Sequence, residues 1–162
     1  MPEHYGTLPA ALAYHEARGN VAWTAAGTDD GKRTAALVRA SQALDAFYGA
    51  RYPGAIASAD QDLLWPRANV VWRGADLADD VVPAPIEKAT YELALRELVK
   101  PGSLAPDVAA GPQKVLTRVD KIEWEVIGNS ASRAVMPIVD GILADILTQA
   151  PTGTTVTTLV RF

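Results

Sequence analysis

The sequence contains no cysteine among its 162 residues, and it has only two histidines. The lack of cysteine excludes disulfide frameworks, thiolate nucleophiles and sulfur-ligated zinc or iron. Long hydrophobic runs are absent too, since no stretch of about 18 uncharged apolar residues occurs. The apolar run at residues 8–14 follows no basic segment, so we expect no signal peptide and no membrane partner.

Signatures of catalysis and of ligand binding are equally scarce. The glycines are scattered rather than gathered into a phosphate-binding loop, and no serine has the surroundings of a nucleophile elbow. His15 falls on a predicted helix, where a lone histidine is more often a packing or surface residue than a ligand. The acidic residues within 60–62 and 76–80 lack the ligand spacing of a calcium loop. We therefore expect no enzymatic activity, no cofactor and no metal site.

Positive charge is limited as well, with 15 Lys and Arg against 19 Asp and Glu and a formal net charge of −4. Nucleic-acid binding draws much of its affinity from cations that neutralise phosphates, so this balance argues against that role unless cations gather in a local patch. Hydrophobic residues make up 49% and charged residues 21%, as in ordinary globular proteins. The length fits one domain.

Helical periodicity, together with capping and stop residues, predicts about four helices. Thr7 can cap the first helix and Gly19 can end it. The strongest pattern is the last, in which apolar residues recur at i, i+3, i+4 and i+7 from Val135 to Leu147. Pro137 cannot donate an interior hydrogen bond, so the regular helix begins close to it or has a distorted first turn. The four predicted ranges are 9–18, 32–48, 85–99 and 135–147.

Three non-helical segments complete the predicted fold. Residues 49–84 are interrupted by Gly and Pro, and their aromatic side chains favour a long loop packed on the helices. Residues 114–127 alternate with a period of two and predict a hairpin that turns near Asp120. Residues 149–162 are rich in Thr and Val, which favour extended chain. The predicted fold is mainly α: a small bundle of about four helices (residues 1–148) with one β-hairpin, a long packed loop and an extended C-terminal arm (residues 149–162).

The apolar residues of this arm are unusual for a terminal segment, which is normally polar. Such a β-prone segment is expected to pair with another strand. It could add to the hairpin of its own chain or dock on a second subunit by strand addition, and the sequence does not choose between the two. The residues expected to anchor the arm are Val156, Leu159, Val160 and Phe162.

Two further groups of residues have more than one interpretation. Trp65, Pro66 and Arg67, with Trp72 nearby, could stack nucleic-acid bases, but a core or elbow role is favoured because no basic groove accompanies them. The hairpin carries a basic cluster that is most simply a solvated sheet face and is also a candidate contact with a neighbouring subunit. Its members are Lys114, Arg118 and Lys121, with Arg133 nearby. Trp124 is either packed on the helices or presented to the neighbour.

The order of several short segments resembles that of a family of tailed-phage and prophage proteins. These segments include Tyr5-Gly6-Thr7, the Trp-Pro-Arg of residues 65–67, the run that starts with Tyr91 and Glu92, and Val139-Asp140-Gly141. Members of this family are often labelled DnaT-like single-stranded-DNA-binding proteins. The family also looks like the head-to-tail connector adaptors, which are small helical proteins that ring the portal vertex of the capsid.

The resemblance implies a structural connector of a tailed bacteriophage, found in the virion neck and in the host cytoplasm during assembly. A homo-oligomeric ring of twelve copies would bind the portal protein and the next neck or tail protein, a stopper or tail terminator, and extend the DNA channel without sequence-specific binding. The C-terminal arm would then contact the portal or a neighbouring subunit, while Trp65, Pro66, Arg67, Tyr91 and Glu92 would be the structural motif of the family. The alternative is a single-stranded-DNA-binding, DnaT-like replication protein. The acidic net charge favours the connector.

Overall fold

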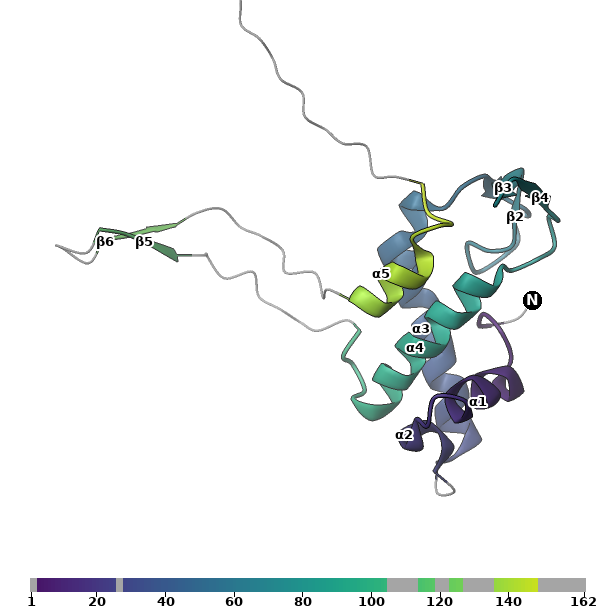
Figure 1. The fold of residues 1–162 in the computed structure, drawn as a ribbon, viewed down its shortest axis with the longest axis horizontal. Helices are drawn as coiled ribbons and strands as arrows, with labels where there is room; N and C mark the ends of the chain where they lie inside the picture. The colour runs from purple at the N-terminus through teal and green to yellow at the C-terminus, as the bar shows by residue number, and fades with distance from the viewer. Residues whose placement is uncertain (1–2, 26–27, 105–113, 119–122, 127–135, 149–162) are drawn as a thin grey trace, which may run out of the picture.

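The computed structural model describes residues 3–25, 28–104 and 136–148 in full, and residues 114–118 and 123–126 by their backbone (Figure 1). Its helices are α1 (Leu8–Glu16), α2 (Val21–Thr24), α3 (Asp30–Tyr48), α4 (Ala84–Val99) and α5 (Pro137–Leu143), with a 3-10 turn, η1, at Gly49–Arg51. The mainly helical fold expected from the sequence is confirmed. Three of the four predicted helices agree with the structure to within about two residues at each end.

Helix α4 lies at the centre of the bundle and packs against α1, α2, α3 and α5 (Figure 1). It is apolar on more than one face because it has neighbours on several sides. Its side chains at Ile86, Leu93 and Ala94 are fully or almost fully removed from solvent, as are Leu37 and Leu44 on α3. The core therefore forms mainly between α3 and α4, and the shorter helices close its sides.

The first predicted helix, 9–18, corresponds to α1, and a second, short helix follows it. Thr7 caps α1 as expected, since its hydroxyl accepts a hydrogen bond from the backbone N–H of Ala10. After Gly19, the chain forms the separate helix α2, which the sequence analysis did not predict. A helix of four residues is too short to show a period, and its stability comes from packing instead. Trp23 of α2 is completely buried.

The long segment between α3 and α4 is a packed loop that contains four short strands, as expected. Strands β1 (Ala55–Ile56) and β2 (Arg67–Ala68) pair antiparallel, and so do β3 (Val70–Trp72) and β4 (Ala75–Leu77). Asp45 of α3 holds this loop, because its carboxylate accepts hydrogen bonds from the backbone N–H of Leu64 at 2.8 Å and from the hydroxyl of Tyr5 at 2.7 and 2.8 Å. The loop is thus fixed to the bundle by partly buried polar contacts as well as by apolar packing.

The predicted hairpin is also present. Strand β5 (Lys114–Arg118) pairs antiparallel with β6 (Glu123–Val126), with Leu116 opposite Trp124 and an irregularity in register between Leu116 and Arg118. The turn near Asp120 lies outside the described residues.

Helix α5 begins at Pro137, which agrees with the first of the two alternatives, but it ends at Leu143 rather than at Leu147. The next residues form turns, and the backbone N–H of Thr148 donates to the carbonyl of Arg51 at 2.9 Å. Tertiary contacts therefore stop the helix before its apolar period ends. The C-terminal arm, residues 149–162, lies outside the described residues.

Candidate functional site

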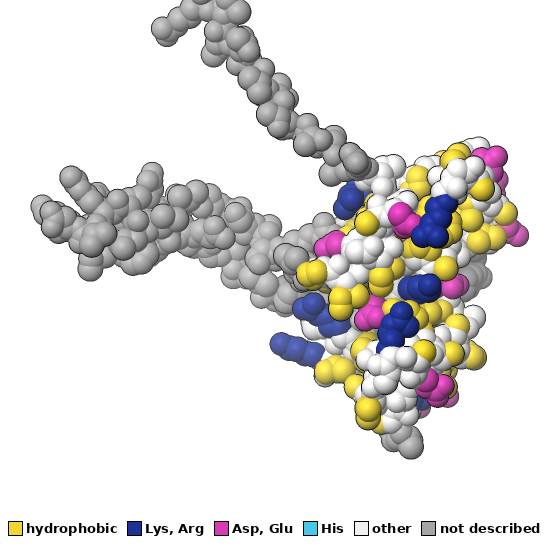
Figure 2. Space-filling model, in the orientation of Figure 1, with side chains coloured by type: hydrophobic (Ala, Val, Ile, Leu, Met, Phe, Trp, Pro, Cys, Tyr) yellow, Lys and Arg dark blue, Asp and Glu magenta, His cyan; other side chains and the backbone are white. Residues whose placement is uncertain are grey.

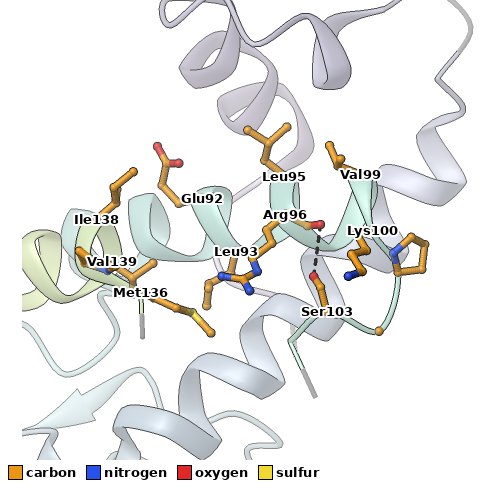
Figure 3. Close-up of a pocket in the computed structure, with 13 residues that line it drawn as sticks. Glu92, Leu93, Leu95, Arg96, Val99, Lys100, Ser103, Met136, Ile138 and Val139 are labelled. Atoms are coloured by element: carbon orange, nitrogen blue, oxygen red, sulfur yellow. Dashed lines mark hydrogen bonds between the residues drawn. The ribbon is translucent and has the colours of Figure 1, made fainter. Parts of the chain in front are cut away.

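A cavity of about 610 Å³ lies between α4 and α5 (Figure 3). One wall is the C-terminal half of α4, the second is the loop that follows it, and the third is the beginning of α5. Among the described residues, the lining contains apolar side chains with a few charged or hydroxyl-bearing ones and no aromatic side chain. The lining residues are Glu92, Leu93, Leu95, Arg96, Val99, Lys100, Pro101, Gly102, Ser103, Met136, Pro137, Ile138 and Val139.

The apolar part of the lining has a buried floor and an exposed rim. Met136 and Val139 are buried, and Leu93 is only 1% exposed. At the rim, by contrast, Val99 is 64% exposed and Ile138 is 66% exposed. Large aliphatic side chains exposed on both walls of one cavity offer apolar surface that a ligand could cover.

Helix spacing brings the charged residues of the rim onto one side of α4. Lys88, Glu92, Arg96 and Lys100 follow one another at steps of four, so they lie in a row along the helix. Lys88, Arg96 and Lys100 are exposed, whereas Glu92 is partly buried. The two cations nearest the cavity, Arg96 and Lys100, are both lining residues.

The acidic member of this row is already engaged. Glu92 accepts a hydrogen bond from the hydroxyl of Tyr14 at 2.7 Å, and its carboxylate lies 3.7 Å from Nε of Arg18. Burial, followed by the hydrogen bond to Glu92, raises the pKa of Tyr14, so that this phenol keeps its proton and remains a donor. The negative charge of Glu92 is therefore offset by Arg18, and the rim keeps a positive character.

The other cations of the row are not engaged in this way. In the part of the chain that the structure describes, ion pairs use Arg18, Arg33, Arg39 and Arg73, but none uses Lys88, Arg96 or Lys100. Figure 2 shows Lys and Arg side chains on the face that contains α4 and α5. Exposed cations without an acidic partner can attract anionic ligands even though the whole chain is acidic.

A buried carboxylate fixes the loop that forms the second wall. Glu97 is 2% exposed, and its Oε1 accepts hydrogen bonds from the backbone N–H of Gly102 at 2.8 Å and forms an ion pair with Nε of Arg39 at 2.9 Å. The hydroxyl of Ser103 donates to the carbonyl of Arg96 at 3.4 Å (Figure 3). The loop is thus held against the end of α4, and the cavity has a preformed wall.

The Trp-Pro-Arg segment has a structural role, as the sequence analysis favoured. Trp65 is 2% exposed and packs against Tyr52, with 5.6 Å between the ring centroids. Arg67 is buried, and its guanidinium donates to the carbonyls of Pro53, Gly54 and Leu64 at 2.6, 2.8 and 3.2 Å. Neither side chain is available to stack on a base, and the carbonyl of Pro66 between them accepts a hydrogen bond from the side-chain amide of Gln61 at 3.1 Å.

The remaining predicted residues have the following places. Tyr91 is buried, with its hydroxyl oxygen accepting from the backbone N–H of Thr7 at 3.4 Å, and Glu92 lines the cavity. Backbone alone is described for Lys114, Arg118 and Trp124, which lie on the hairpin. Lys121 and the anchoring residues of the arm are outside the described residues: Val156, Leu159, Val160 and Phe162. The expected contacts of these residues stay predictions.

The sequence analysis missed the cavity because its walls come from residues 92–103 and 136–139, which are far apart in the chain. The charged row of α4 could have indicated a binding surface. Such a row is more often simply the solvent-exposed face of a helix, so it did not predict the cavity. Among the described residues, no group of three or more His, Cys, Asp or Glu side chains could hold a metal ion, and no helix is long and apolar enough to cross a membrane.

Comparison with known proteins finds one family. A family model described as "Putative DnaT-like ssDNA binding protein" matches residues 3–162, which is nearly the whole chain. No curated protein and no solved structure matches.

This match corrects the connector interpretation. The family description names single-stranded DNA, and nothing in it supports a portal, a stopper or tail terminator, or a ring around a DNA channel. The connector role and these partners are therefore wrong. The net charge sums the whole chain and does not show that Lys88, Arg96 and Lys100 are exposed and form no ion pair with another described residue. The expected location, which followed from that role, is untested.

Proposed function

Because the chain belongs to the DnaT-like single-stranded-DNA-binding family, we propose that it binds single-stranded DNA through the cationic row of α4 and the rim of the α4–α5 cavity. The family match over residues 3–162 is the observation that carries this proposal. The geometry supports this location, since this face combines exposed cations with an apolar hollow. The proposed activity is binding without catalysis.

The spacing of the cations suits a strand of phosphates. Residues four apart on a helix are separated by about 6 Å along its axis, which is close to the distance between successive phosphates in an extended single strand. Arg96 and Lys100 have this separation, and Lys88 lies two such steps before Arg96. A strand that follows α4 would therefore meet cations at more than one phosphate.

The proposed site lies at the C-terminal end of α4, where the helix dipole disfavours an anionic ligand, and Arg96 and Lys100 offset this effect. The C-terminal end of a helix carries partial negative charge, which repels phosphates. Arg96 lies in the last turn of α4, and Lys100 follows that turn directly. Their charges oppose the helix dipole, so that the rim as a whole attracts an anionic strand.

The proposal predicts a salt-dependent affinity that depends on these two cations. For single strands, the logarithm of the binding constant falls with the logarithm of salt concentration by about 0.7 for each phosphate neutralised. The double variant Arg96→Gln/Lys100→Gln should therefore flatten this slope by about 1.4 and weaken binding about tenfold or more at low salt. Fluorescence anisotropy of a labelled thymidine homopolymer, titrated at several salt concentrations, measures both quantities.

The single variant Lys100→Gln, which should flatten the slope by about 0.7, has Lys32→Gln as its matched control. Lys32 is an exposed lysine near the start of α3 and does not line the cavity, so its loss changes the net charge equally without touching the proposed site. We expect Lys32→Gln to keep the slope of the unmodified protein. A full-length protein without measurable affinity at low salt would contradict the proposed function, and an unchanged slope in the double variant would contradict the proposed site.

A further inference from the structure

We propose that the α4–α5 cavity receives one unstacked base of the bound strand, while Arg96 and Lys100 hold the neighbouring phosphates. This inference rests on the proposed function and adds how the strand is recognised. The inference concerns contacts with the bases. Contacts with phosphates alone do not distinguish one base from another.

The cavity has the size and character of a site for a small planar group. Its volume of about 610 Å³ lies within the range of about 300 to 1,000 Å³ that is usual for pockets that enclose small organic molecules. The floor at Met136 and Val139 is buried and apolar, and it can cover the faces of a base. The entrance is lined by the exposed side chains of Val99 and Ile138.

The polar groups of the cavity lie where a nucleotide has polar atoms. Ser103 and Glu92 add a hydroxyl and a carboxylate to the lining, and each oxygen group can accept a further hydrogen bond beside the contact that it already makes. Arg96 and Lys100 supply positive charge beside the apolar floor. An occupant that fits this arrangement has an apolar planar part and an adjacent negative charge, as a nucleotide in a strand does. An apolar peptide would fill the hollow but would leave the two cations without an anion.

The wall that closes the cavity is preformed, which favours binding of a base. The buried carboxylate of Glu97 holds Gly102, so the loop needs little ordering when a ligand enters. A site that is ordered in advance loses less conformational entropy on binding. Burial of the base then stabilises the complex without a large loss of conformational entropy in the loop.

No aromatic side chain is among the described residues that line the cavity, and this gives a specific spectroscopic test. The fluorescence of 2-aminopurine is quenched when it stacks on other bases or on aromatic rings, and it recovers when the base is unstacked. A strand with 2-aminopurine at one position should therefore become severalfold brighter when the full-length protein binds it. Stacking on an aromatic side chain elsewhere would keep the emission low.

Val99→Trp and Val71→Trp form a matched pair for this test. Val99 is 64% exposed at the cavity, and Val71 is 66% exposed on β3, so both substitutions place an indole on the surface. At Val99, the indole fills the entrance or stacks on the incoming base, and in either case the gain in emission should disappear. Val71→Trp should keep it. Circular dichroism checks that both variants are folded.

A second arm separates this inference from the proposed function. An abasic strand of equal length carries the same phosphates but no bases, and the unmodified protein should bind it about tenfold or more weakly, since each stacked or buried base contributes to affinity. Equal affinity for the two strands, or emission that does not rise on binding, would overturn the base site but leave the binding of phosphates in place. No binding of either strand would overturn the proposed function itself.

Discussion

At the scale of single residues, several side chains that could contact a ligand instead hold the structure together. Arg67 is the clearest case, because its guanidinium donates to three backbone carbonyls of the long loop while the side chain is buried. Carbonyl groups in such a place need donors, since water cannot reach them. By contrast, Arg96 is exposed and lines the cavity. Two arginines of the same chain thus differ in burial and in contacts, and composition cannot distinguish them.

We expect Arg67→Lys to lower the free energy of unfolding by about 1 to 3 kcal/mol, because a lysine cannot supply the planar set of donors that serves three carbonyls. Urea denaturation measures this loss. Under conditions where the variant is folded, its affinity for single-stranded DNA should equal that of the unmodified protein. Arg96→Gln is the converse control, with reduced affinity and unchanged stability; a large loss of affinity in Arg67→Lys would instead place Arg67 in the binding site.

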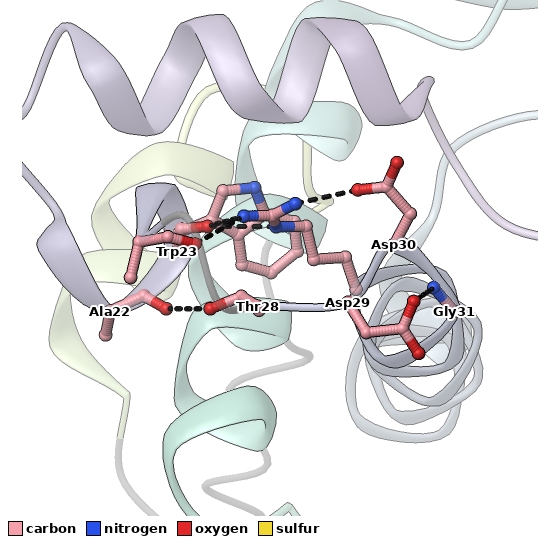
Figure 4. Close-up of polar contacts among 8 residues, drawn as sticks. Ala22, Trp23, Thr28, Asp29, Asp30 and Gly31 are labelled. Atoms are coloured by element: carbon pink, nitrogen blue, oxygen red, sulfur yellow. Dashed lines mark hydrogen bonds and ion pairs between the residues drawn. The ribbon is translucent and has the colours of Figure 1, made fainter.

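At the scale of elements, the helices follow local rules where the chain supplies caps. Asp29 caps α3, since its carboxylate accepts a hydrogen bond from the backbone N–H of Gly31 at 3.1 Å (Figure 4). Helix α2 depends on tertiary contacts instead. The buried side chain of Arg33 donates to the carbonyl of Trp23 at 2.9 and 2.7 Å and forms an ion pair with Asp30 at 2.7 Å. These bonds join the end of α2 to the first turn of α3.

Asp29→Ala should destabilise the protein by about 1 kcal/mol, because it leaves the first turn of α3 without its capping acceptor. Thermal denaturation followed by circular dichroism provides the measurement. Asp29→Asn keeps a capping oxygen and should be nearly neutral, so it separates the cap from other effects of the substitution. Equal losses in the two variants would show that the carboxylate charge, rather than the cap, is important.

The sequence predicts the elements that form through interactions between residues close in the chain, and it fails where residues far apart in the chain form the contacts. The period of apolar residues identified α3 and α4 with nearly correct ends, because helix formation depends on neighbours three and four positions apart. The same signal extended α5 to Leu147, where the structure has turns, and missed α2. Both errors occur where distant residues decide the backbone: Arg33 acts at α2, and Arg51 accepts the hydrogen bond from Thr148 after α5.

At the scale of the whole molecule, titratable groups are divided between a charged surface and a buried interior. His15 is completely buried and accepts a hydrogen bond from the side chain of Asn20 at 3.0 Å. Its ring packs against Trp23 at a tilt of 41°, with 4.6 Å between the ring centroids. Burial lowers its pKa from the ordinary value of 6.5. Asp45 behaves in the opposite sense, because burial raises its pKa from 3.8. The stability of the folded chain therefore depends on pH through groups that the surface does not show.

The stability should fall as the pH decreases below 6.5, since the unfolded His15 takes up a proton that the buried ring resists. The unfolded state then binds more protons than the folded state, and the slope from this residue is at most about 1.4 kcal/mol per pH unit. This effect of His15 operates between pH 6.5, the ordinary pKa of the unfolded residue, and the lower pKa of the folded state. The protonated Asp45 stabilises the folded state, and this contribution is complete below pH 3.8. It is lost as the pH rises through the raised pKa of the folded state.

Comparison with His15→Gln isolates the histidine, because the glutamine does not titrate and every other group is common to the two proteins. Urea denaturation at intervals between about pH 5 and pH 7 covers the window around the ordinary pKa of histidine. The difference in unfolding free energy between the two proteins should diminish as the pH falls. A constant difference over this range would mean that His15 does not resist protonation.

The sequence by itself determined the class of the fold, the two long helices, the packed loop and the hairpin, because each depends on residues that are close in the chain. It also determined that cysteine chemistry is excluded. Only the tertiary structure decided which charges are paired, which arginine is buried, and that residues 92–103 and 136–139 enclose one cavity. The physical reason is that pairing, burial and enclosure are properties of contacts between distant segments, and neither composition nor local periodicity contains them.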